Sequence, residues 1–144
     1  MRIGVRVAPS GDPGALFADA RAIEAAGADS LWADVADGDP YVTLAALAAV
    51  TWRIRLVAGG PADARGRETC ARLARGRLVV ADELEERWTH SPFPESKAAW
   101  RKQRADAEAA GIDGITIPND ERLIDLLRNP DVEDDRFDLN IAVG

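Results

Sequence analysis

Polar residues and glycines follow several of the strands that the sequence predicts, and these are the positions where we expect chemistry. Ligands of parallel α/β proteins bind at the carboxyl ends of strands, because the loops there vary while the strands fix their geometry. Glycine at such an end lets a ligand approach the backbone, although a plain turn explains it equally well. The candidates by this criterion are Pro9, Ser10, Asp34, Asp37, Gly59, Gly60, Asp82, Pro118 and Asn119.

His90 is the single histidine and the most obvious acid–base candidate, because its ordinary pKa lies near neutrality. It lies between an acidic run and two prolines, Pro92 and Pro94. No serine or cysteine nucleophile with an orienting acid is tied to it by spacing. We therefore favour a position in a surface loop over a catalytic role and assign no catalytic residue.

The sequence contains no pattern typical of a metal site or of a phosphate-binding loop. Neither the Walker pattern nor Gly-x-Gly-x-x-Gly occurs. Cys70 has no second cysteine, so we predict a small hydrophobic side chain on a helix and no metal site. An acidic cluster lacks the glycine and glutamate of a calcium loop, and we interpret it as a solvated connection: Asp131, Glu133, Asp134, Asp135 and Asp138.

The stretch from Thr51 to Arg77 is locally basic, although the net charge is −7 and the pI about 4.7. Its arginines either hold a phosphate or pair with downstream acids, and we favour pairing. The overall acidity disfavours nucleic-acid and membrane partners. The arginines are Arg53, Arg55, Arg65, Arg67, Arg72, Arg75 and Arg77, and the acids are Asp82, Glu83, Glu85 and Glu86.

Hydrophobic patterning predicts about six short strands alternating with helices, which is typical of the α/β class with a parallel sheet. Asp12-Pro13 and Asp39-Pro40 carry the signals that begin helices. The predicted strands cover 1–7, 29–34, 54–58, 77–81, 115–117 and 138–143, and the helices cover 13–26, 40–50, 63–74, 95–110 and 120–128. We predict one or two helical turns over 82–87 and a loop from Trp88 to the fourth helix.

The first sixty residues resemble the start of the bacterial luciferase-like, flavin-dependent monooxygenases and oxidoreductases. The resemblance rests on MRIGV at the start, AIEAAGADSLWA from Ala22, and DPYVTLAALAAVTWRIRLVAGG from Asp39 to Gly60. It implies FMN or a deazaflavin coenzyme as cofactor and an unusual peptide geometry near Ala58-Gly59. From this geometry and from the positions that follow predicted strands, we expect five residues at the cofactor: Asp34, Ala58, Gly59, Gly60 and Asn119.

The resemblance implies a TIM barrel, but a complete barrel takes about 250 residues, and this chain has 144. We therefore predict a single domain over residues 1–144 with a shortened TIM-barrel-like fold of parallel (β/α) units. An incomplete barrel leaves sheet edges unpaired, which predicts a homodimer.

Two hypotheses for the function follow. The first is a luciferase-like flavin- or deazaflavin-dependent oxidoreductase with a small-molecule substrate, in which the cofactor does the chemistry. The second is a truncated, non-catalytic homologue that acts as a dimeric scaffold or binds a small ligand. No long apolar span or signal peptide is recognisable, so we expect a cytoplasmic protein.

Overall fold

The computed structural model describes residues 1–9, 11–60 and 64–132, and strands and helices alternate along them, as predicted. The strands are β1 (Arg2–Arg6), β2 (Ser30–Asp34), β3 (Arg55–Gly59), β4 (Leu78–Val80), β5 (Trp88–His90) and β6 (Gly114–Pro118). The helices are α1 (Pro13–Ala25), α2 (Pro40–Ala48), α3 (Ala64–Ala74), α4 (Lys97–Ala109) and α5 (Leu123–Arg128), with 3-10 turns η1 (Val35–Asp37) and η2 (Ala81–Glu83).

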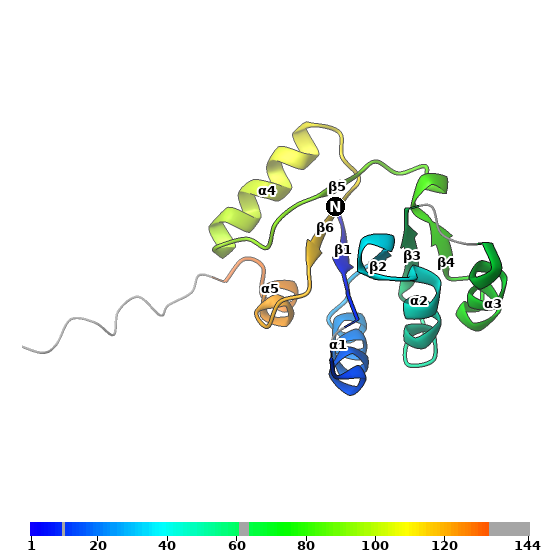
Figure 1. Ribbon diagram of the computed structural model, residues 1–144. Coiled ribbons are helices and arrows are strands. Elements are labelled where there is room, and N and C mark those ends of the chain that lie inside the picture. The colour runs from blue at the N-terminus through cyan, green and yellow to red at the C-terminus, as the bar shows by residue number, and fades with distance from the viewer. Residues whose placement is uncertain (10, 61–63, 133–144) are drawn as a thin grey trace, which may run out of the picture.

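All strand pairs are parallel, and the order across the sheet is β4-β3-β2-β1-β6-β5. The sheet is curled into a half-barrel, which confirms the shortened parallel (β/α) fold. Figure 1 shows α3 and α4 at opposite ends of this arrangement. Strands β4 and β5 follow one another in the chain yet form the two edges of the sheet, so residues 81–87 pass from one edge to the other.

One predicted loop is a strand in the structure. Trp88–His90 forms the edge strand β5, which pairs with β6 through Trp88↔Gly114 and His90↔Thr116. Within the acidic run, Ala81–Glu83 makes a 3-10 turn and no α-helix. The sixth predicted strand, 138–143, lies outside the described residues.

Aspartates begin the first two helices, as the sequence predicted. Asp12 Oδ1 accepts the Gly14 N–H at 2.9 Å, and Asp39 Oδ1 accepts the Tyr41 N–H at 2.8 Å. A proline follows each aspartate, where no backbone donor is needed. These caps begin both helices just beyond the carboxyl ends of their preceding strands, and so bring α1 and α2 to the edge where sites form.

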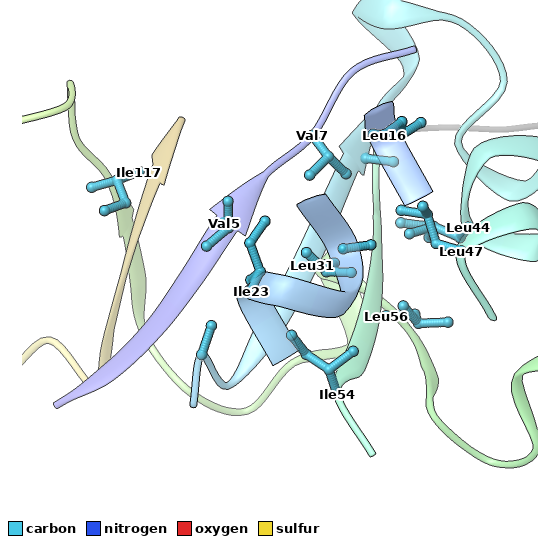
Figure 2. Packing of buried hydrophobic residues seen from close by; sticks show 14 of the residues in the cluster. Val5, Val7, Leu16, Ile23, Leu31, Leu44, Leu47, Ile54, Leu56 and Ile117 are labelled. Carbon is cyan, nitrogen blue, oxygen red and sulfur yellow. The ribbon is translucent and has the colours of Figure 1, made fainter. Parts of the chain in front are cut away.

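The core lies between the helices and one face of the sheet. Alternate strand residues such as Val5, Leu31 and Leu56 are fully buried in it. Figure 2 shows these side chains close to those of α1 and α2, including Ile23 and Leu44. Because side chains alternate along a strand, the residues between them face the concave side of the half-barrel.

The Glu24 carboxylate, near the end of α1, binds the turn that leads into β3. It accepts the N–H groups of Trp52 at 2.9 Å, Arg53 at 2.6 Å and Ile54 at 2.8 Å. Burial favours the protonated carboxyl, but these three donors and the charge of Arg77 outweigh it and lower the pKa of Glu24. The ionised carboxylate therefore fixes the position of the turn.

We expect Glu24→Gln to lower the free energy of unfolding by about 1 kcal/mol at pH 7, a figure that allows for solvent screening. Since the folded pKa lies below the unfolded value, the stabilisation is complete above pH 4.5 and is lost as the pH falls through the folded pKa. Urea unfolding at pH 7 and pH 3 measures this difference. Glu108→Gln, an exposed position on α4, is the control, and an equal deficit at both pH values would contradict the prediction.

Candidate functional site

A cavity of about 750 Å³ opens at the carboxyl ends of the strands. Its volume lies within the range of small-molecule sites, and its walls mix apolar side chains with a few polar ones. Strands β1, β2, β3, β5 and β6, with α1 and η1, supply the lining: Arg6, Val7, Ala8, Leu16, Asp19, Trp32, Ala33, Asp34, Ala36, Asp37, Gly59, His90, Pro118 and Asn119.

Three of the five residues expected at the cofactor line this cavity. Asp34 ends β2, and its Oδ1 accepts the Ala36 N–H at 2.9 Å, which begins η1. Gly59 ends β3 beside it. Asn119 follows β6, and its amide donates to Asp19 Oδ2 at 2.7 Å. The topology thus brings together residues that are far apart in the sequence.

Ala58 and Gly60 do not line the cavity. Ala58 is fully buried in the core on the helix side, because neighbouring residues of a strand face opposite sides. Gly60 has a φ of +77° and lies against the Val35 side chain. No described peptide bond is cis and Gly59 has no positive φ, so the left-handed backbone is at Gly60 and not at Ala58-Gly59.

The remaining carboxyl-end candidates divide in the same way. Asp37 and Pro118 line the cavity, whereas Pro9 and Asp82 do not. Ser10 lies outside the described residues.

His90 lies on the edge strand β5 and lines the cavity, so the predicted loop is wrong at this position, although the residue is exposed, as expected. Its Nδ1 is 2.5 Å from Thr116 Oγ1 on the neighbouring strand. The ring stands edge-on to Trp32, with centroids 5.7 Å apart. Pro92 and Pro94, which suggested a loop, come after the strand has ended. The one local feature of the sequence that favours a strand here is the β-branched residue Thr89.

Burial lowers the pKa of His90, and the nearby charge of Arg6 lowers it further, while Asp34 opposes them. We therefore expect a neutral imidazole at pH 7 and an NMR titration midpoint below 6.5. The chain has one histidine, so its resonance needs no assignment. Arg6→Gln is expected to raise the midpoint and Arg128→Gln, which does not line the cavity, to leave it unchanged. A midpoint at or above 6.5 in the unmodified chain would contradict this account.

Two tryptophans cover the concave face of the sheet below the cavity. The rings of Trp32 and Trp88 pack with centroids 5.1 Å apart. A Cβ on Gly4 or Gly114 would come within 2.5 Å of the Trp32 or Trp88 ring, respectively, so each ring lies directly on glycine backbone. Trp32 Nε1 donates to Ser30 Oγ at 2.8 Å. Trp32, which lines the cavity, is therefore held by ring packing against Trp88 and by its hydrogen bond to Ser30.

Two arginines of the basic stretch, Arg55 and Arg67, pair with the downstream acids as favoured from the sequence, whereas Arg72 pairs with Glu68 and Arg77 donates to Thr51 Oγ1 and to backbone carbonyls. Arg67 binds Glu83 at 2.7 Å, and Glu86 pairs with Arg55 at 3.0 Å and with Arg2 of β1. None of these arginines lines the cavity. The residues that bind a ligand must therefore be sought elsewhere.

Cys70 is fully buried on α3, and burial raises the pKa of its thiol, as expected of a small core side chain. Within residues 1–9, 11–60 and 64–132, no group of three metal-ligating side chains occurs. No helix in that part of the chain is long and apolar enough to cross a membrane.

Neither a family model nor a curated protein matches the sequence. Among solved structures, the crystal structure of a Gox0644 mutant in complex with NADPH aligns with 88% of this chain at 14% sequence identity and a TM-score of 0.39. The chain spans 48% of that protein's length. Similarity at this level carries no argument about function, which must come from the geometry of the cavity.

Proposed function

We propose that the cavity binds a flavin or deazaflavin cofactor and that the protein is an oxidoreductase of the luciferase-like type. The supporting observation is that Asp34, Gly59 and Asn119, which we expected at a cofactor because each follows or ends a strand, meet at one cavity at the carboxyl ends of the strands. They meet because β2, β3 and β6 are parallel, which brings the carboxyl ends of these strands to the same edge of the sheet.

The residues around the cavity suit a flat ring system. Gly59 presents no side chain, and a Cβ there would come within 2.8 Å of Asp34 Oδ2. Trp32 provides an aromatic floor, and Val7 and Leu16 provide apolar walls. A flavin-type group, when bound, supplies hydride or electron transfer.

The residues that line the cavity would bind and orient this group and exclude water from it. His90, with Nδ1 held at Thr116, is the titratable side chain on the cavity wall suited to exchange a proton near pH 7.

Saturable binding tests the proposal directly. We expect FMN or the deazaflavin coenzyme to bind with a Kd of tens of micromolar or tighter, seen as quenching of cofactor fluorescence. Ala36→Phe places a ring at the mouth of the cavity and keeps the backbone N–H that caps η1, so it is expected to weaken binding at least tenfold. Ala71→Phe, on the exposed side of α3, is the matched control. Absence of binding in the unmodified protein would overturn the proposal.

A non-catalytic, self-associating homologue is the second candidate, favoured by the two edge strands. The outer edges of β4 and β5 have no strand partner among the described residues, and such edges pair readily with another chain. A homodimer that covers them is expected by analytical ultracentrifugation at micromolar concentration. If the protein is a monomer at this concentration and binds the cofactor, the self-associating homologue is excluded and the oxidoreductase remains.

A further inference from the structure

Carboxylates outnumber cations around the cavity. Asp19, Asp34 and Asp37 face it from α1, β2 and η1, and Arg6 is the single arginine or lysine in its lining. None of the three aspartates forms an ion pair with a described lysine or arginine. Among the described residues these charges are therefore not neutralised by ion pairs, and the described rim of the cavity carries a net negative charge.

Arg6 offsets this charge only in part. Its Nη2 donates to the Ser91 carbonyl at 2.6 Å, and its Nε is buried without a partner among the described residues. The guanidinium is thus partly used in holding the chain after β5. It is one positive charge among three negative ones, too few to neutralise a phosphate as well.

Three of the helix N-termini at this end of the sheet, those of α1, η1 and α2, are also occupied by side chains of the chain. Parallel α/β proteins commonly bind phosphate at such termini, where free N–H groups and the helix dipole favour an anion. Here Asp12, Asp34 and Asp39 place their own carboxylates on the first N–H groups of α1, η1 and α2 at 2.8–2.9 Å. A phosphate at any of these positions would have to displace a covalently attached anion.

Hydroxyl groups suit the same surroundings. An ionised carboxylate only accepts hydrogen bonds, and a hydroxyl donates one without bringing charge. Asp34 and Asp19 each have one oxygen bonded within the protein, to Ala36 N–H and to the Asn119 amide, which leaves acceptor capacity on both. Asp37 is exposed at the rim.

We infer that the cavity takes its ligand in an uncharged, hydroxyl-bearing form and discriminates against the phosphorylated form of the same molecule. The inference rests on the proposed function for the choice of ring system. In flavin terms, the protein prefers riboflavin, whose side chain is a neutral polyol, over FMN, which ends in a phosphate.

Paired fluorescence titrations with riboflavin and FMN test this preference. We expect FMN to bind about tenfold more weakly than riboflavin at low salt, because a dianion about 10 Å from two net negative charges is repelled in water by roughly the energy of a tenfold change in affinity. This difference in affinity should narrow as added salt screens the charges. Asp37→Asn removes a rim charge whose side chain makes no hydrogen bond to a described residue, and it is expected to narrow the difference in affinity about threefold. Glu108→Gln, the same loss of charge on α4 away from the lining, should leave it unchanged.

The outcomes separate the two proposals. FMN binding as tightly as riboflavin, or tighter, would overturn the preference while supporting a flavin-binding function. Binding of neither would overturn both. If Asp37→Asn and Glu108→Gln reduce the difference in affinity between riboflavin and FMN equally, the preference arises from the overall acidity of the protein and not from the cavity.

Discussion

Replacement of Trp100 by alanine is expected to lower the free energy of unfolding by about 3–5 kcal/mol. Trp100 lies on α4 and is fully buried in the core cluster. Its removal leaves a cavity that neighbouring helices and strands can close only in part. Because small domains have about 5–15 kcal/mol of stability in total, the variant should unfold at much lower urea concentration than the unmodified chain.

Trp52 provides a matched control, since it is the same residue type with 68% of its surface exposed. Its ring packs beneath the Arg75 guanidinium, 4.7 Å from the ring centroid, so Trp52→Ala should cost less than about 1 kcal/mol. Trp100→Phe is informative as well. Because Trp100 Nε1 is buried without a partner in the described structure, this change also removes an unsatisfied donor and should cost much less than alanine. Equal losses for Trp100→Ala and Trp52→Ala would contradict the assigned core.

Gly4→Ala is the second large effect that we expect, about 2–3 kcal/mol of destabilisation. The added Cβ would lie 2.5 Å from Trp32 Nε1 and 2.9 Å from Ser30 Oγ. The Trp32 ring must then move, which breaks its hydrogen bond to Ser30 and changes the floor of the cavity. The variant should therefore lose ligand affinity as well as stability, measured by urea unfolding and by cofactor titration.

Gly11→Ala is the control for this change, because no atom lies within 4 Å of a Cβ built there. A second substitution tests the cause. Trp32→Phe removes the ring nitrogen that an alanine at position 4 would meet, so the double variant should be less destabilised than the sum of the two single changes. Strict additivity, or a loss below about 0.5 kcal/mol for Gly4→Ala, would show that the ring does not rest on β1.

Much of the fold could be predicted because its signals are local. The aspartate-proline pairs at Asp12 and Asp39 and the buried runs of β2 and β3 act within a few residues of their own position. Strand β5 could not be predicted in this way. Trp88–His90 has three residues and is a strand because β6 lies beside it, and β6 comes after an intervening helix.

The candidate site divides along the same line. Asp34, Gly59 and Asn119 were found because the carboxyl end of a strand can be located from its pattern, and parallel strands bring such ends together. Ala58 does not line the cavity, because alternation along β3 turns its side chain to the face opposite that of Gly59. His90 and Trp32 were missed because their role depends on which strands are neighbours.

The position of β1 between β2 and β6 also determines when the sheet can be completed during protein synthesis. One edge of β1 can pair with β2 as soon as β2 has been synthesised. The other edge can pair only after synthesis of β6, the last strand of the described chain. At about 5–20 residues per second, roughly ten seconds pass between the emergence of β1 and that of β6. During that interval β1 has an unpaired edge, and unpaired edges of apolar strands are prone to aggregation before the sheet is complete.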